Sequence, residues 1–315
     1  MDRSRSRAKE PPLALDRIRW KGEQSFRMLS YYFSVRWNIE AAGDQILYAL
    51  RDFAVPQDAE EHPEIWAPSL PPNYSIVRRG SGKLRYHLLY GNDVMLTTNT
   101  LDRALANLFW QVNTQTIRQS GDFLLIHAGA VSTPAGEGIL LPSVSGGGKT
   151  TLVTALVRRG FSYLSDEGGA VDPVSRELYP YHRPLSLKEG HAHLFPDLCE
   201  RANGSDWAVG QRWIHPEDVR PGAVGGPCPI RFVIAHQYRP GTPTEITPLT
   251  PAQGAMELLT NALNLPRYRS RALPLVADVA RRARSYRLVS GNLEEAVQTI
   301  IELTGERRRA ATRAI

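Results

Sequence analysis

The sequence predicts an α/β protein in two parts: a smaller, mainly β N-terminal domain and a larger domain in which strands and helices alternate. Three observations predict this class. The first hundred residues carry the alternating apolar and polar side chains that are typical of strands. After Leu101, apolar runs of strand length alternate with segments of helical periodicity. Between two of these elements lies the stretch SVSGGGKTT (143–151), where three consecutive glycines join a strand to a helix.

Composition limits the classes of protein. The chain has 315 residues, 42% of them hydrophobic and 22% charged, which is enough apolar content for one or two real cores. The longest apolar runs are too short to cross a bilayer, and the basic start is not followed by the apolar stretch of a secretory signal. Two cysteines make no disulfide framework, so we expect a cytoplasmic protein.

The net charge of +6 lies partly at the two ends of the chain. We expect residues 1–12 and 306–315 to be disordered, solvated basic tails, and we prefer that interpretation to arms that bind nucleic acid.

The N-terminal domain is predicted over residues 13–100. Phe26–Ile39 and Lys83–Gly91 alternate as strands do. Between them, residues 55–74 hold five prolines in twenty residues, which predicts a loop.

The larger domain is predicted over residues 101–305. A helix begins at Leu101, carries Leu105, Leu108 and Phe109 on one face, and ends at Gly121. The elements expected after it are strands at 122–131 and 137–143, a helix at 149–159, strands at 161–165, 170–172, 177–179 and 231–238, helices at 252–265 and 273–284, and a last helix from Asn292 with a capping box at Glu295. Residues 190–229 look irregular. A strand, a glycine loop, a helix and a strand in succession predict a βαβ nucleotide-binding unit.

The glycine loop has the chemistry of a phosphate-binding P-loop. Glycines allow unusual backbone angles, so that amide groups converge on phosphate oxygens, and the following helix adds its dipole. We expect Lys149 to neutralise phosphate charge, Thr150 to hold Mg²⁺, and Thr151 to continue the nucleotide contact. The turn is formed by Ser145, Gly146, Gly147 and Gly148. Ser143 stands where the strict pattern has glycine, and an ordinary glycine-rich turn is the alternative.

Residues 124–172 resemble the catalytic core of HPr kinase/phosphorylase and its relatives. That family pairs a histidine at the end of one strand with a P-loop at the end of the next and an acidic pair further on. Here these positions hold His127, the loop ending in Lys149 and Thr150, and the pair Asp166–Glu167. The resemblance implies a phosphoenolpyruvate-carboxykinase-like P-loop core, with ATP as phosphoryl donor and Mg²⁺ as cofactor. The acidic pair is Asp-Asp in the HPr enzymes, and their phosphorylase signature is not found here.

Roles follow for the acidic pair. We expect Asp166, just past an apolar strand, to be the general base and Glu167 to be the metal-side carboxylate, although the opposite assignment stays open. By resemblance, His127 orients the base. Arg183 and Lys188, in the segment HRPLSLKEG, present cations to ATP or to the acceptor, or else lie on the surface.

The expected activity is transfer of the γ-phosphate of ATP to a serine hydroxyl of a peptide or small protein. Similar stand-alone kinases phosphorylate precursor peptides in lasso-peptide biosynthesis, which gives one candidate acceptor class. Two alternatives remain: a nucleotide-binding regulator without catalysis, and a kinase for a small molecule such as free serine. A GTPase is not favoured, because no N/T-K-x-D motif follows a strand. We expect neither nucleic acid nor membrane as a partner, and a homo-oligomer is left open.

Overall fold

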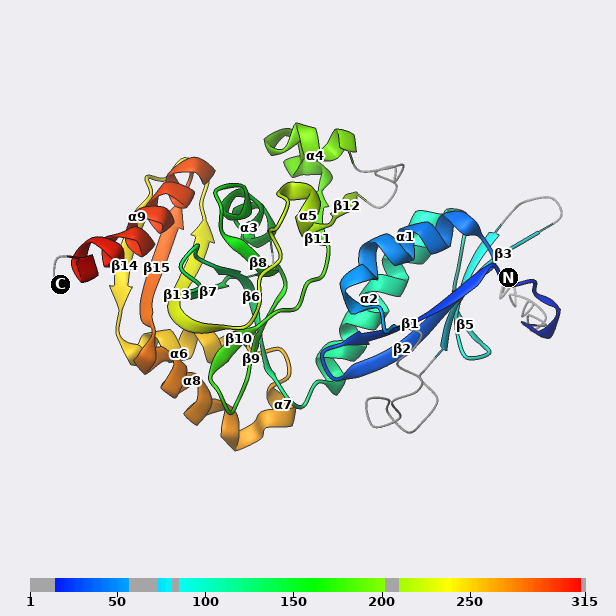
Figure 1. The fold of residues 1–315 in the computed structure, drawn as a ribbon, viewed down its shortest axis with the longest axis horizontal. Coiled ribbons are helices and arrows are strands. Elements are labelled where there is room, and N and C mark those ends of the chain that lie inside the picture. Colours follow the sequence, from blue (N-terminus) through cyan, green and yellow to red (C-terminus); the bar gives the residue numbers. More distant parts are fainter. Residues whose placement is uncertain (1–14, 57–72, 81–84, 145, 202–209, 313–315) are drawn as a thin grey trace, which may run out of the picture. The chain divides into compact units, whose positions relative to one another are not determined.

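The computed structural model describes residues 15–56, 73–80, 85–144, 146–201 and 210–312, and the chain is a mixed α/β protein (Figure 1). The chain divides into two compact units. Unit 1 comprises residues 1–26, 32–47 and 54–110, and unit 2 comprises 27–31, 48–53 and 111–315. The predicted tail over 1–12, Ser145 of the glycine loop and most of the proline-rich loop lie outside the described residues.

One five-stranded sheet forms the core of unit 1, in the order β1-β2-β3-β4-β5. Its strands are β1 Gly22–Met28, β2 Tyr31–Trp37, β3 Asn73–Arg79, β4 Arg85–Tyr90 and β5 Asp93–Thr98. Strands β2 and β3 are parallel, whereas β3, β4 and β5 are antiparallel. The sheet agrees with the mainly β character that the alternation predicts.

A helix that the alternation does not predict, α1 (Glu40–Leu50), follows β2. Ala42 and Ile46 are fully buried, and their spacing of four is helical. Gly43 lets the helix lie close to Trp37, because a Cβ at Gly43 would come 2.2 Å from the indole Nε1. The second long helix, α2 (Leu101–Gln119), is the one predicted to begin at Leu101.

Unit 2 is built on an eight-stranded sheet, in the order β10-β9-β6-β7-β13-β15-β14, with β8 also paired to β6. Its strands are β6 Leu124–Ser132, β7 Gly138–Pro142, β8 Ser162–Ser165, β9 Gly168–Val171, β10 Glu177–Tyr179, β13 Cys228–Tyr238, β14 Glu245–Leu249 and β15 Arg284–Ser290. β7, β13 and β15 are parallel to one another, so their carboxyl ends share one edge of the sheet.

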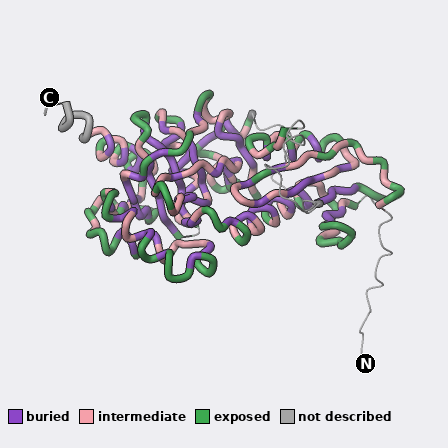
Figure 2. The backbone as a smooth tube through the Cα atoms, turned by 60° about the horizontal axis from the view of Figure 1, so that its bottom comes forward, coloured by how far each residue is buried: buried purple, intermediate pink, exposed green. Residues whose placement is uncertain are grey.

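Helices cover both faces of this sheet (Figure 1). On one face α3 (Lys149–Arg158) and α9 (Leu293–Thr312) pack on Ile139, Leu141 and Phe232. On the other face α6 (Pro251–Thr260) and α8 (Ala272–Arg282) pack on Leu140 and Val233. Successive side chains of a strand therefore pack into the cores on opposite faces of the sheet. This explains why the sequences of these strands are continuous apolar runs. In Figure 2 the buried residues lie mainly on inner segments of the chain and the exposed ones mainly on its outer bends.

The predicted βαβ unit is present with one strand inserted into it. β6 pairs antiparallel with β7 and also antiparallel with β8, using residues 130–132 for both, so it lies between them. On the side of β6 away from β7, β8 and then β9 pair with β6 in nearly the same register. Ser165 lies opposite Ala130, and Gly168 lies opposite His127. The two residues that interrupt this ladder are Asp166 and Glu167.

Residues 190–229, which look irregular in the sequence, contain regular elements. These are η4 Glu189–Leu194, α4 Pro196–Arg201, β12 Gln211–Ile214 and α5 Pro216–Val219. β12 pairs antiparallel with β11 (Leu185–Lys188) to form a separate two-stranded sheet. The elements are short, which is why their periodicity is not visible in the sequence.

Other boundaries also differ from expectation. The helix predicted over 252–265 ends earlier, at Thr260 in α6, and a separate short helix, α7 (Leu265–Tyr268), begins at Leu265. α9 extends to Thr312, beyond the predicted end of the larger domain at residue 305. The short 3-10 helices η1, η2 and η5 cover Leu15–Arg17, Arg51–Phe53 and Arg269–Arg271.

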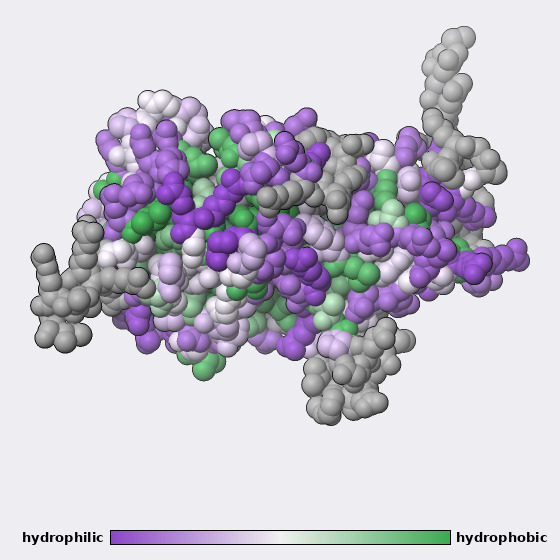
Figure 3. Space-filling view, turned by 45° about the horizontal axis from the view of Figure 1, so that its top comes forward, coloured by the Kyte–Doolittle hydropathy of each residue, from purple (hydrophilic) through white to green (hydrophobic). Residues whose placement is uncertain are grey.

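Among the described helices, none has the length and apolar character needed to cross a membrane. On the face drawn in Figure 3, hydrophilic side chains predominate and hydrophobic ones lie in separate patches. Cys199 and Cys228 are both free thiols.

Candidate active site

The glycine loop, residues 143–148, joins β7 to α3 and depends on its glycines. Gly146 and Gly148 have φ angles of 80° and 83°, a left-handed conformation that side chains disfavour. Gly147 has no room for a side chain, because a Cβ there would lie 2.1 Å from Ser143 Oγ and 3.0 Å from the carbonyl oxygen of Val144. All three glycines are therefore required by backbone angle or by close approach.

Ser143, the departure from the strict pattern, does not strain this loop. It is absent from the described non-glycine residues with positive φ, so its backbone is one that serine adopts readily. Its side chain is buried against Gly147. The serine thus replaces glycine without forcing the backbone.

Lys149 is the first residue of α3 and lies inside the loop, with only 7% of its surface exposed. Its Nζ donates hydrogen bonds to the carbonyl oxygens of Ser143 (2.7 Å) and Val144 (3.0 Å). Burial lowers the pKa of Lys149, and the charges of Glu167 and Asp166 oppose that shift. A cation held by neutral carbonyls in this way can turn to an anion that enters the loop.

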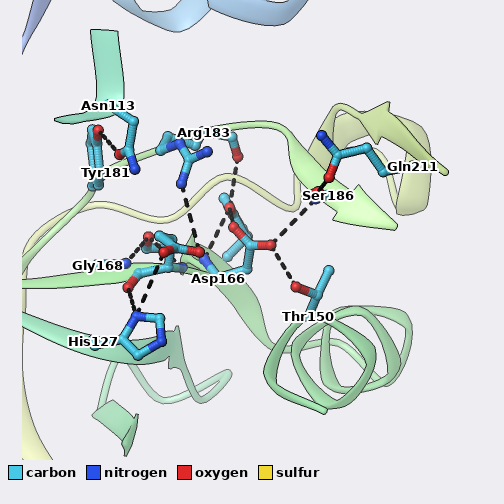
Figure 4. A network of polar contacts seen from close by, with 12 residues as sticks. Asn113, His127, Thr150, Asp166, Gly168, Tyr181, Arg183, Ser186 and Gln211 are labelled. Atoms are coloured by element: carbon cyan, nitrogen blue, oxygen red, sulfur yellow. Dashed lines mark hydrogen bonds and ion pairs between the residues drawn. The ribbon is translucent and has the colours of Figure 1, made fainter. Parts of the chain in front are cut away.

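Asp166 lies at the carboxyl end of β8 and reaches the first turn of α3 (Figure 4). Its Oδ2 accepts a hydrogen bond of 2.8 Å from Thr150 Oγ1 and one of 3.3 Å from the amide of Ser186. The carboxyl group is 3% exposed, and burial raises its pKa although the charge of Arg183 lowers it. These contacts fix a buried carboxylate beside the glycine loop.

Tyr163 holds Asp166 in place through hydrogen bonds of its phenol oxygen. The fully buried phenol oxygen accepts from the Asp166 amide at 3.1 Å and donates to the Arg183 carbonyl at 2.6 Å. Asp166 Oδ1 lies 3.2 Å away as a second acceptor. Burial raises the pKa of Tyr163 well above its usual value, so the phenol stays protonated.

Glu167 points to a different set of partners. His127 Nδ1 lies 3.6 Å from Glu167 Oε1 and 3.3 Å from the Glu167 carbonyl oxygen, and Arg183 Nη1 lies 3.9 Å from Oε2. Both neighbours of His127 Nδ1 are oxygens, so we assign the proton to that nitrogen. The Glu167 side chain is 39% exposed, in contrast to that of Asp166.

His127 lies within β6 rather than at the end of a strand, opposite Gly168. Burial and the charge of Lys149 lower its pKa, and Glu167 opposes the shift. Its imidazole is therefore neutral near pH 7.

The other predicted site residues fall in three places. Arg183 joins the carboxylates from the segment before β11, as Figure 4 shows. Lys188 is exposed at the end of β11, where its charge lowers the pKa of Lys149. Thr151 Oγ1 lies 3.4 Å from His191 Nδ1 and is not joined to the carboxylates.

The donor set suits one hard cation. Among the described residues no three His, Cys, Asp or Glu side chains are grouped to form a cage. Mg²⁺ does not require one, because it keeps several waters and binds through one or two carboxylates together with phosphates. The Thr150 hydroxyl and the Asp166 carboxylate are the residues that could hold it.

The sequence analysis does not predict three residues that line or support the site. They are Tyr163, Ser186 and His236, a buried histidine behind the loop. Ser186 and His236 reach the site from elements far along the chain, and Tyr163 joins Asp166, three residues away, to the distant Arg183 carbonyl. The only sequence signal is a weak one, the placement of Tyr163 three residues before Asp166 in an apolar strand.

No protein-family model and no curated protein matches this chain.

Proposed function

We propose that this protein is a P-loop kinase with an HPr-kinase-like core, which transfers the γ-phosphate of ATP to a serine hydroxyl of a peptide or small protein. The observation that carries the proposal is the contact between Thr150 and Asp166. It joins the residue after the loop lysine to a buried carboxylate at the end of β8, which is separated from β7 by β6. Phosphoryl transfer needs this combination of a phosphate cradle, a cation and a metal-side carboxylate.

The glycine loop supports phosphate binding. The amino terminus of α3 follows Gly148 directly, so its free amides and its dipole favour an anion at the loop. Lys149 would exchange its two carbonyl partners for β- and γ-phosphate oxygens.

Asp166 is the better candidate for the metal side. Thr150 donates to Asp166 and not to Glu167, and a P-loop threonine shares its cation with the carboxylate that it contacts. When bound there by Thr150 and Asp166, Mg²⁺ would supply charge neutralisation for the phosphates. This assignment is the opposite of the one first expected from the sequence.

Glu167 is then the candidate general base. It is partly exposed, so an acceptor hydroxyl can reach it, and His127 and Arg183 flank it. The Nδ1–H of His127, 3.6 Å from Glu167 Oε1, can hold the Glu167 side chain in one orientation. The resemblance that gives histidine the task of orienting the base also favours Glu167, because Glu167 is the carboxylate beside His127.

The bonds and the proton of the proposed phosphoryl transfer can be followed atom by atom. The serine oxygen forms a bond to the γ-phosphorus, while the bond from that phosphorus to the β,γ-bridging oxygen breaks and leaves ADP. The hydroxyl proton passes to Glu167. Lys149 and Arg183 stabilise the charge on the phosphoryl oxygens. The acceptor class, including a lasso-type precursor peptide, rests on the resemblance in residues 124–172.

A phosphotransfer assay tests the proposal. The full-length protein is incubated with ATP, Mg²⁺ and serine-containing peptides, and each peptide is followed by intact mass. Matched peptides with alanine in place of serine and free serine serve as alternative acceptors. We expect one phosphoryl group on the serine peptides, with the wild type but not with Lys149→Ala. ATP binding without transfer to any acceptor would favour the regulator instead.

A further inference from the structure

His236 is a buried histidine that the proposed chemistry does not use. It lies on β13, paired with Leu288 of β15, two residues before the carboxyl end of the strand. Only 6% of its surface is exposed. β13 is the strand next to β7, so this end of β13 lies beside the glycine loop.

The imidazole ring lies directly behind the loop. A Cβ placed on Gly148 would be 3.8 Å from His236 Cε1 and 3.7 Å from Tyr238 Cβ, which is ordinary packing distance. On its other side, His236 Nε2 lies 3.0 Å from Ser290 Oγ, at the end of β15. The ring therefore lies between the glycine loop and the carboxyl end of β15.

The second ring nitrogen has no partner. Nδ1 of His236 is buried and makes no hydrogen bond to any described residue. Burial lowers the pKa of His236 to about 4, so the ring is neutral at pH 7 and carries one proton. A hydrogen-bonding contact with the Gly147 backbone opposes this shift, so that backbone already lies near the ring, although Nδ1 has no hydrogen bond of full geometry.

An unsatisfied buried nitrogen is costly and native proteins contain few of them, so the unpaired Nδ1 requires an explanation. In a P-loop the amides turn toward phosphate, and the carbonyls must turn away from it. The Gly147 backbone already lies near the ring, so this turn would bring its carbonyl oxygen to full hydrogen-bond geometry with His236.

We propose that His236 is a positioning residue for nucleotide binding, whose Nδ1–H donates to the Gly147 carbonyl when the triphosphate occupies the loop. Ser290 then donates to Nε2, which fixes the tautomer with the proton on Nδ1. The inference rests on the proposed function, because it needs a nucleotide at the glycine loop.

Two substitutions distinguish the contribution of Nδ1 from that of Nε2. In His236→Asn the side-chain amide nitrogen reaches the place of Nδ1, whereas in His236→Gln it reaches the place of Nε2. The affinity for a fluorescent ATP analogue with Mg²⁺ is measured for both variants and for His236→Leu. We expect His236→Asn to stay within about threefold of the wild type. The Gln and Leu variants should bind about tenfold more weakly, the equivalent of one net hydrogen bond.

The possible outcomes are distinct. Equal affinity of the Asn and Gln variants overturns the positioning role of His236. Absence of nucleotide binding by the wild type overturns the proposed function itself. Melting temperatures without nucleotide show whether each variant folds. If the variants do not fold, ¹⁵N-histidine spectra of the wild type decide: His236 Nδ1 should be protonated and should shift on addition of ATP and Mg²⁺. An unprotonated or unchanged Nδ1 contradicts the inference.

Discussion

The hydroxyl of Thr150 donates a 2.8 Å hydrogen bond to Oδ2 of Asp166. The two residues are sixteen positions apart and belong to the first turn of α3 and to the interruption between β8 and β9. Because both residues lie where their elements meet the same edge of the sheet, small changes in either should alter nucleotide binding more than folding.

Lys149→Ala should weaken ATP binding by about 100-fold, because it removes the one cation buried within the loop. Titration with a fluorescent ATP analogue measures the change. Lys188→Ala is the matched control, since Lys188 is exposed at the end of β11 and should change affinity by about threefold at most. Equal losses in the two variants would contradict the role of Lys149.

Glu167→Gln should separate catalysis from binding. The amide cannot accept the acceptor proton, so kcat should fall by about 10²- to 10⁴-fold, while ATP affinity stays within about threefold. Single-turnover transfer to the best peptide substrate measures kcat. If Glu167→Gln keeps wild-type turnover, Glu167 is not the base and the role returns to Asp166.

Asp166→Asn should make the protein inactive and yet more stable. Burial raises the pKa of Asp166 in the folded state, so its contribution to stability is fully present below the unfolded pKa and is lost as pH rises through the folded pKa. Asparagine removes this cost, so the melting temperature of the variant should exceed that of the wild type near pH 7. The difference should shrink toward about pH 4. A variant less stable at every pH would show that the charged form is favoured in the fold.

Gly147→Ala should disrupt the loop through two contacts, one with the Ser143 side chain and one with the Val144 carbonyl. Overpacking of this kind costs about 1–3 kcal/mol, and nucleotide affinity should fall with it. Ser143→Gly alone should change affinity little, because Ser143 has no unusual backbone angle. In the double variant part of the loss should be recovered. A Gly147→Ala protein with normal stability and affinity argues against this loop geometry.

A second charged cluster within unit 2 gives a stability prediction. Asp52 Oδ2 lies 2.9 Å from Nε2 of the fully buried His215 and 4.0 Å from His182 Nδ1, and Arg51 contacts the other nitrogen of His215. His182 is the neighbour of Arg183, so the cluster supports the segment that enters the site. Asp52→Asn should destabilise the protein by about 2 kcal/mol at neutral pH.

The pH dependence of that effect has a defined sign. Burial alone raises the pKa of Asp52, but the hydrogen bond from His215 and the charges of His215, His182 and Arg51 together lower it. The stabilisation is therefore present above the unfolded pKa and is lost as pH falls through the folded pKa. Thermal melts over a pH series should show the wild type and Asp52→Asn converging in acid. A constant difference would mean that the carboxylate charge is not involved.

The residues around the glycine loop could be predicted because their pattern is local. Lys149, Thr150 and the glycines lie within six residues, and the two strands that flank them are continuous apolar runs. The acidic pair also has a local signal, because it stands directly after an apolar strand. Tyr163 has only a weak one, its place three residues before Asp166. Ser186 has none, because the course of the chain after β10 brings its amide to Asp166.

Two features of the fold are not predicted by the sequence. The alternation of the preceding strands hides α1, although Ala42 and Ile46 keep helical spacing. The inserted strand β6 between β7 and β8 could not be foreseen, because periodicity gives the type of an element and not its neighbours. The division of roles between Asp166 and Glu167, which the sequence leaves open, depends on which side chain meets Thr150.

The most direct test of the central claim is the Mg²⁺ dependence of ATP binding, measured by calorimetry on the wild type and on Asp166→Asn. The account predicts that Mg²⁺ strengthens ATP binding by the wild type and that the variant loses about 10- to 100-fold of this enhancement. ATP binding that is unaffected by Mg²⁺, or equally enhanced in both proteins, would contradict the pairing of Thr150 and Asp166 as the metal side of a nucleotide site.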